Sequence, residues 1–281
     1  DEAVKNSYEV RFLSSQKKIK RMRRMRWMSV AASLLIVLGI GYYVLAPSTF
    51  APLSQTAFLE RSTPYGERSV VVLPDSSTVY LEPGSKIRYP EHFTQNTREI
   101  SLEGEAFFDV VRDDTKPFIV RTGKVSTTVL GTSFKILDVE GHPLDIAVAT
   151  GKVSVKKTNR LSSVSLALLT AGEKILYDKA TEKLTVSSFD AESLKRWRHG
   201  ELDFQDEKLA TVMDHLQRIY GVTIRIETSA LADRKISATF NRTEPIESVV
   251  EMLAFVGKFS YDCDSSNRVI TLYNYQKYGI K

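Results

Sequence analysis

The feature that most constrains this chain is a run of basic residues followed directly by a long apolar run without charge. The basic run contains no acid and consists of Lys17, Lys18, Lys20, Arg21, Arg23, Arg24 and Arg26. The next twenty residues, Trp27 to Ala46, carry no charge. Twenty helical residues span about 30 Å, which is the thickness of the hydrocarbon core of a bilayer. The sequence therefore predicts a single transmembrane helix over residues 27–46.

Two alternatives account less well for residues 27–46. A buried helix of a soluble core rarely runs for so long without a charge. A cleaved signal peptide would have a shorter apolar run, and Pro47 would follow the scissile bond, where a signal peptidase tolerates proline poorly. With one retained span, the positive-inside rule places the basic arm 1–26 in the cytoplasm. Residues 47–281 are then exported, into the periplasm if the cell is a diderm bacterium, and the protein is a single-pass inner-membrane protein.

The distribution of charge argues against a nucleic-acid-binding protein, although the net charge is +5. Residues 1–46 hold nine Lys and Arg against three Asp and Glu, whereas the rest of the chain holds 30 bases and 31 acids. The excess of bases lies beside the apolar run, which fits attraction to an anionic inner leaflet. The single cysteine, Cys263, allows no intramolecular disulfide, so an exported domain must be stable through its core alone.

The pattern after the apolar run predicts a spacer and then a β-rich domain. Residues 47–68 contain three prolines among Ser, Thr and Gln, which is typical of an extended spacer. From residue 69 to about 187, short stretches rich in Val, Thr, Ile and Phe recur at roughly ten-residue spacing, with Gly, Pro and Asp between them. The stretches SVVVL and TVYLE, separated by PDSS, predict a hairpin. We expect an all-β domain that is solenoid- or sandwich-like.

Residues 188–281 predict a small α+β domain with the order β-α-β-β-α-β-β after a short helix in FDAESLKRW. The strands are GELDF, VTIRI, ISATF, FSYDC and VITLY. Apolar residues at helical spacing predict two amphipathic helices. They are a helix from about Glu207 to Tyr220 that Gly221 ends, and a helix starting near Glu244 with Thr243 as its N-cap and Gly257 at its close.

No arrangement of residues predicts an ordinary enzyme, a metal site or a cofactor. The histidines, His92, His142, His199 and His215, lack the spacing of a metal site. His215 lies on the polar side of its helix, where we expect it to be solvated. Cys263 follows an apolar strand without an activating base, so we expect it to be half-buried rather than nucleophilic. The sequence also lacks a P-loop, a G-x-S-x-G motif and an H-E-x-x-H motif.

Gly131 and Thr132, within VLGTSF, are the one candidate for chemistry on the backbone. A threonine hydroxyl can attack the preceding carbonyl when the peptide is strained, which gives an N→O acyl shift and chain cleavage, and glycine does not block the approach. The alternative is a bulge or turn glycine in a β-sheet.

A string of motifs in this chain resembles the FecR-like anti-sigma regulators. In order they are LPDSSTVYLEPGSKIRYP, REISLEGEAFFDVVRDDTKPFIV, VLGTSFKI, GKVSV and AGEKI. The later stretch RWRHGELDFQDEKLATVMDHLQRIYGVTIRI resembles the C-terminal module of the Bacteroidetes members, which is similar to the secretin/TonB short N-terminal domain. The resemblance covers about residues 62–275.

The resemblance implies a relay across the envelope. The partners it implies are the signalling domain of an outer-membrane TonB-dependent transporter, the inner membrane and a cytoplasmic extracytoplasmic-function sigma factor. Some relatives cleave themselves at a Gly-Thr pair, which Gly131-Thr132 matches. Exposed edge strands in the 201–273 module would accept a strand from a partner. From the residues themselves we expect no cofactor, no enzyme activity beyond the possible self-cleavage, and no direct contact with nucleic acid.

The chain departs from the family pattern at three places. The family has Asp-Gly-Ser where this chain has Asp75-Ser76-Ser77, and Asn and Ala where it has Glu82-Pro83. We expect these changes to affect turns rather than an active site. The arm 1–26 is shorter than the cytoplasmic helical domain that grips the sigma factor, and we interpret it as a truncated anti-sigma region. A true absence of that domain would favour the alternative function, a periplasmic structural adaptor of an envelope assembly anchored in the inner membrane.

Overall fold

The computed structural model describes residues 32–42, 57–158, 162–264, 266 and 268–274, which belong to two compact units, Asp1–Gln55 and Thr56–Lys281. In the first unit residues 32–42 form a helix. None of the helices in the described ranges is both long enough and apolar enough to span a membrane. Residues 27–31 and 43–46 of the predicted span, and all seven bases from Lys17 to Arg26, lie outside the described residues.

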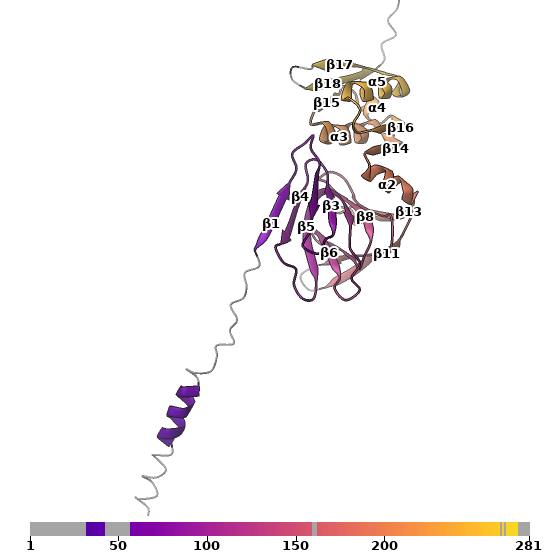
Figure 1. The fold of residues 1–281 in the computed structure, drawn as a ribbon. Helices are drawn as coiled ribbons and strands as arrows, with labels where there is room; N and C mark the ends of the chain where they lie inside the picture. The colour runs from indigo at the N-terminus through magenta and orange to yellow at the C-terminus, as the bar shows by residue number, and fades with distance from the viewer. Residues whose placement is uncertain (1–31, 43–56, 159–161, 265, 267, 275–281) are drawn as a thin grey trace, which may run out of the picture. The chain divides into compact units, whose positions relative to one another are not determined.

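The second unit begins with a β-domain made of two sheets. Sheet A has the order β1 (Phe58–Ser62), β4 (Lys86–Pro90), β5 (Arg98–Asp109), β6 (Phe118–Thr122), β7 (Val125–Val129), β10 (Lys152–Thr158) and β11 (Ser163–Thr170). Sheet B has the order β2 (Ser69–Val72), β3 (Thr78–Leu81), β5, β8 (Ser133–Asp138), β9 (Leu144–Val148), β12 (Glu173–Tyr177) and β13 (Leu184–Ser188). The pairs are antiparallel except β5 and β6, which are parallel. The structure thus has the expected β-rich domain, with β1 inside the segment predicted as spacer (Figure 1).

Strand β5 joins the two sheets. Its first half pairs with β4 and β6, and its second half pairs with β3 and β8. Gly104 lies at the change of sheet with φ of +100°, and a Cβ there would lie 2.5 Å from Oγ of Ser85. Because only glycine combines that φ with that close approach, Gly104 lets one strand serve both sheets.

The second half of β5 is buried on both faces. Phe108 points into the core between the sheets, where its ring stacks on Phe134 with centroids 5.0 Å apart. Phe107 points to the outer face of sheet B and belongs to a second core that it shares with C-terminal residues. Successive side chains of a strand face opposite sides, so two adjacent phenylalanines are both buried only when both faces are covered. The C-terminal elements therefore cover the outer face of sheet B at this point.

The C-terminal module, orange to yellow in Figure 1, follows the β-domain directly. Its elements are α2 (Ala191–Arg198), β14 (Glu201–Lys208), α3 (Leu209–Tyr220), β15 (Thr223–Ile226), α4 (Ser229–Ala232), β16 (Lys235–Asn241), α5 (Ile246–Gly257), β17 (Phe259–Asp264) and β18 (Val269–Asn274). Strands β14 and β16 form one sheet, and β15, β18 and β17 form another in that order. The expected order of strands and helices is confirmed, with α4 as an additional turn of helix.

The helix ends match the sequence prediction in one case and differ in the other. Gly221 ends α3 in the left-handed conformation, as predicted. Helix α5 begins at Ile246, and Thr243 is not its N-cap, because its hydroxyl donates to Asn241 Oδ1 instead. Lys258 rather than Gly257 takes the left-handed conformation after α5. Gly257 stays helical, and a Cβ there would lie 2.8 Å from the Phe259 ring, so packing is what requires this glycine.

The turn between β2 and β3 carries a strained residue. Ser76 has φ of +67°, a conformation that costs a residue with a side chain more than it costs glycine. The Asp75 carboxylate holds the turn, because it accepts a hydrogen bond from Ser77 N at 3.1 Å and pairs with Arg98 at 2.8 Å. The expectation that Ser76 affects the turn is confirmed.

Candidate functional site

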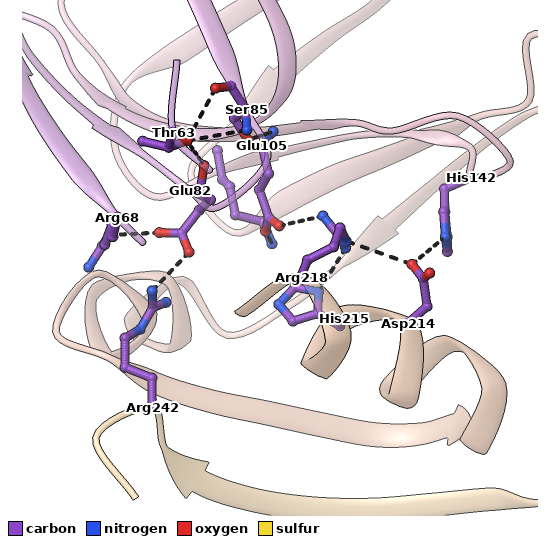
Figure 2. A network of polar contacts seen from close by, with 11 residues as sticks. Thr63, Arg68, Glu82, Ser85, Glu105, His142, Asp214, His215, Arg218 and Arg242 are labelled. Atoms are coloured by element: carbon purple, nitrogen blue, oxygen red, sulfur yellow. Dashed lines mark hydrogen bonds and ion pairs between the residues drawn. The ribbon is translucent and has the colours of Figure 1, made fainter. Parts of the chain in front are cut away.

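Two glutamates of the β-domain lie buried beneath the C-terminal module, and Figure 2 shows the cations that surround them. Glu82 follows β3 and is 1% exposed, and Glu105 lies in the second half of β5 and is also 1% exposed. The backbone joins them, because Glu82 N donates to Glu105 O at 3.0 Å. We call these two carboxylates and the cations that contact them the junction network.

Glu82 pairs with two arginines. Its Oε1 lies 2.7 Å from Arg68 Nε, and its Oε2 lies 2.8 Å from Arg242 Nη1. Arg68 precedes β2, whereas Arg242 follows β16 in the C-terminal module. Burial raises the pKa of the Glu82 carboxyl, while Arg242 and Arg68 oppose that effect and the Glu105 carboxylate adds to it. Glu82 therefore depends on an arginine from the other module to offset its burial.

Glu105 pairs with Lys135 and Arg218. Its Oε1 lies 3.0 Å from Lys135 Nζ, and its Oε2 lies 3.4 Å from Arg218 Nη1. Lys135 is on β8, and Arg218 is on α3 of the C-terminal module. Burial disfavours the charged form, but Lys135, His215 and Arg218 outweigh it and lower the pKa of Glu105 to about 2. Glu105 is therefore ionised at neutral pH, and its charge is held from both modules.

Arg218 extends the network to two histidines. It donates to His215 Nδ1 at 3.2 Å, and its Nε lies 3.7 Å from Asp214 Oδ2, which in turn lies 3.0 Å from His142 Nε2. Burial is the main cause that lowers the pKa of His215 to about 4. The Glu105 carboxylate opposes this effect, while Arg218 and Lys135 add to it. The prediction of a solvated His215 is therefore wrong. The polar side of α3 faces the β-domain, so the His215 ring is half-buried at the junction, where it contacts Arg218 and Phe204.

Trp197 of α2 seals the same junction. Its ring lies 6.2 Å from the Phe107 ring, centroid to centroid, and is 8% exposed. Three cations of the network lie near its ring: Lys135 at 4.9 Å, Arg68 at 5.3 Å and Arg242 at 5.7 Å. Cations near an aromatic face gain electrostatic attraction, and the ring also excludes water from them. Trp197 thus couples the apolar contact and the ionic network.

A cavity of about 540 Å³ opens beside the network, with β8, β9 and β12 on one side and α2, β14 and α3 on the other. Lys135, Asp145 and His215 line the cavity and have shifted pKa values. Burial raises the pKa of Asp145, although Lys135 and Lys174 oppose it. Within the described residues, no group of three or more His, Cys, Asp or Glu side chains is placed to hold a metal ion. The arrangement suits charge neutralisation between modules.

The candidate cleavage pair lies apart from the junction network. Gly131 and Thr132 connect β7 to β8, and the Thr132 hydroxyl, on a residue that is 3% exposed, donates to Lys152 O at 3.1 Å. A Cβ at Gly131 would lie 2.4 Å from Arg112 Cα, so close packing requires this glycine. Cys263 is half-buried, as predicted, and burial raises the pKa of its thiol.

The junction network was not predicted from the sequence. The sequence predicts only a turn role for Glu82, and the structure corrects this, because its carboxylate is buried between Arg68 and Arg242. The available signal was Glu105, a carboxylate on an otherwise apolar strand end, since such a charge needs a partner when buried. The identity of the partners could not follow from this signal, because Arg242 lies 160 residues from Glu82.

Comparisons with known proteins match both modules. The chain fits the family described as FecR protein over residues 60–154 and the family described as FecR, C-terminal over residues 201–272. Two crystal structures of a candidate anti-sigma factor from Parabacteroides distasonis ATCC 8503 are similar to it. Both have a TM-score of 0.69, with 30% and 31% identity, and they cover 78% and 77% of this chain and 99% of their own chains.

The chain belongs to the FecR family. The resemblance to FecR-like anti-sigma regulators is thereby confirmed. Comparison with curated proteins gives no match. The junction network joins the two parts of the FecR chain, since Glu82 and Glu105 lie in the FecR match and Arg218 and Arg242 lie in the FecR C-terminal match.

Proposed function

We propose that this FecR-family protein is a membrane-anchored anti-sigma regulator. It relays a signal from an outer-membrane TonB-dependent transporter to a cytoplasmic extracytoplasmic-function sigma factor and so controls the transcription of uptake genes. The observation that carries the proposal is the similarity to a candidate anti-sigma factor at 30% identity over 99% of that chain. The role is regulatory and uses no cofactor.

The proposed topology follows from the charge pattern. The seven bases between Lys17 and Arg26 hold the N-terminus in the cytoplasm, and residues 47–281 lie in the periplasm. A periplasmic reporter fused after Lys281 should be active in the native protein and lose activity when all seven bases are changed to Gln. Full activity of the reporter in that variant would contradict the role given to the basic arm.

The C-terminal module offers edges for the transporter's signalling domain. Strands β15 and β17 are the outer strands of the three-stranded sheet, and each pairs only with β18 among the described strands. An outer strand presents backbone donors and acceptors to a further strand, which is the basis of β-augmentation. This supports the module as the receiver of the signal.

Self-cleavage at Gly131-Thr132 is part of the proposal. The Thr132 hydroxyl would leave Lys152 O and attack the Gly131 carbonyl carbon. The hydroxyl proton passes to the Thr132 nitrogen as the Gly131–Thr132 C–N bond breaks, which leaves an ester and a free amine. Water then hydrolyses the ester to a Gly131 carboxylate and a Thr132 hydroxyl. The intact mass of the purified protein should then show two fragments, and Thr132→Ala should give one chain. A single chain for both proteins would support the alternative, a glycine required only for packing against Arg112.

The relay is tested by affinity capture of the full-length native protein from detergent-solubilised cells, followed by mass spectrometry. Recovery of a TonB-dependent transporter together with a sigma factor, both absent from capture with an unrelated single-pass inner-membrane protein, is the expected result. Recovery of envelope assembly proteins without either partner would refute the relay and favour the structural adaptor.

A further inference from the structure

The segment from Thr63 to Arg68 connects β1 to β2 and is held by the C-terminal module. Gly66 N donates to Arg218 O at 2.9 Å, and Arg68 Nη1 donates to Arg198 O at 2.8 Å. The backbones touch as well, because a Cβ at Gly221 would lie 3.2 Å from Tyr65 O. Residues 63–68 thus bridge the strand nearest the N-terminus of the unit and the two helices α2 and α3.

Strand β1 has little else to hold it. All five of its residues are exposed, and among the described strands it pairs with β4 alone. Where β1 ends, Thr63 is 6% exposed and makes polar contacts with the turn before β4: Thr63 N donates to Ser85 O at 2.9 Å, and Gly84 N donates to Thr63 O at 3.0 Å. Because no residue of β1 enters the core, its attachment depends on contacts with β4 and on residues 63–68. The contacts with β4 are the backbone ladder and two exposed side-chain pairs, Lys86 with Glu60 and Arg88 with Phe58.

The junction network places the same segment under the control of the C-terminal module. Arg68 contacts the Glu82 carboxylate, and the other oxygen of that carboxylate contacts Arg242. Removal of Arg242 would leave Glu82 buried with half of its charge contacts, which favours admission of water. Water that enters at Glu82 also reaches Arg68, because both arginines contact the same carboxylate. Arg242 of the C-terminal module and Arg68 of the β-domain therefore separate from Glu82 together. Closely packed ionic contacts of this kind have two arrangements, closed and hydrated.

We propose that the junction network is a latch that couples the position of the C-terminal module to the attachment of residues 63–68. A partner would draw α3 and Arg242 away from Glu105 and Glu82. In the same step, the hydrogen bonds that Gly66 N donates to Arg218 O and that Arg68 donates to Arg198 O break. The segment and β1 are then loosened on the N-terminal side of the β-domain. This inference rests on the proposed function for the identity of the partner, but the latch itself is a property of the free chain.

The latch is tested in the purified full chain in detergent, with Trp27→Phe so that Trp197 is the single tryptophan. The variant Arg242→Glu sets a carboxylate against Glu82 and opens the junction. The control is Arg225→Glu, which makes the same change of charge at an exposed position of β15 in the same module. The readouts are acrylamide quenching of Trp197 and amide hydrogen exchange, measured peptide by peptide.

The expected result for Arg242→Glu is at least tenfold faster exchange in residues 63–68 together with stronger quenching of Trp197. Exchange in α3 and α5 should stay slow, which shows that the module remains folded. Arg225→Glu should match the parent protein in both readouts. Glu82→Gln, which opens the junction from the β-domain side, should show the same two changes as Arg242→Glu.

Three results would overturn the latch. In the first, Trp197 becomes accessible while exchange in residues 63–68 is unchanged, so that module and segment move independently. In the second, neither readout changes in Arg242→Glu. If α3 loses its protection in Arg242→Glu, the milder Arg242→Met and Glu82→Gln are measured, and loss of protection in all three would also refute a latch. Because no partner is present, failure here leaves the relay untouched, and failure of the capture experiment leaves the latch intact.

Discussion

Replacing Glu105 by glutamine removes the charge that Lys135 and Arg218 share. The side chain of Lys135 is 15% exposed and that of Arg218 is 10% exposed, so both cations remain largely buried after the change. Breaking a buried pair by removing one partner costs about 3–5 kcal/mol. Asp145 still attracts Lys135, so we expect the lower end, about 3 kcal/mol. In a unit of this size that loss lowers Tm by roughly 6–12 °C.

The pKa of Glu105 gives a second route to the same magnitude. The value falls from 4.5 to about 2 on folding. A carboxyl with a depressed pKa contributes stability that is fully present above pH 4.5 and is lost as pH falls toward 2. At about 1.4 kcal/mol per pH unit, this corresponds to roughly 3 kcal/mol. The difference in stability between the native protein and Glu105→Gln should therefore be constant above pH 4.5 and shrink below it.

Urea denaturation followed by circular dichroism measures both quantities, at neutral pH and at a series of pH values down to 2.5. The matched control is Glu99→Gln on the same strand, where Glu99 and Arg121 form a pair in which each side chain is 42% exposed. An exposed pair is worth less than about 1 kcal/mol. A loss below 1 kcal/mol for Glu105→Gln, or a loss that does not change with pH, would refute the argument that Glu105 is a buried charge held by both modules.

Three further predictions concern other positions. The pKa of His215 falls from 6.5 to about 4 on folding, so the fold favours its neutral form and stability drops as pH falls from 6.5 to 4. The variant His215→Gln should reduce the pH dependence of the urea midpoint over that range. An unchanged pH dependence would contradict the burial of this ring. Ser76→Gly should raise the free energy of unfolding by roughly 0.5–1 kcal/mol, because Ser76 has a left-handed backbone; a lower urea midpoint would show that the Asp75 turn does not carry strain. Gly131→Ala should lower Tm by several degrees, because the new Cβ would lie 2.4 Å from Arg112 Cα, and a neutral effect in thermal denaturation would show that this contact relaxes freely.

The parts of the fold that the sequence predicted are those set by local pattern. Helix α3 begins two residues after the predicted start and ends at the predicted glycine, because its apolar period and its left-handed Gly221 are both local signals. The hairpin of β2 and β3 likewise follows from β-branched runs around a turn. The prediction of Thr243 as the N-cap of α5 is wrong. A threonine before a helix is typical of an N-cap, but here its hydroxyl donates to Asn241 Oδ1.

The candidate site depends on contacts between modules, which local pattern does not record. His215 lies on the polar face of α3, and the amphipathic pattern of a single helix cannot show that a second domain covers that face. Glu82 stands in a Glu-Pro-Gly stretch that indicates a turn, and only the packing of the C-terminal module turns its carboxylate into a buried one. The ion pair of Glu82 with Arg242 therefore joins positions 160 residues apart, and neither residue departs from the local pattern of its own segment.

The charged character of the junction bears on how it would respond to a partner. Phe107 and Trp197 supply an apolar contact, and such contacts tolerate small rotations because they are not directional. The ion pairs of Glu82 and Glu105 tolerate smaller movements of the module than the apolar contact does. A shift of about an ångström or two separates each carboxylate from its arginine inside a water-poor site. A junction of this composition is either closed or hydrated, with little between. A partner that tilts the C-terminal module would then produce a discrete change at residues 63–68, as the proposed latch requires.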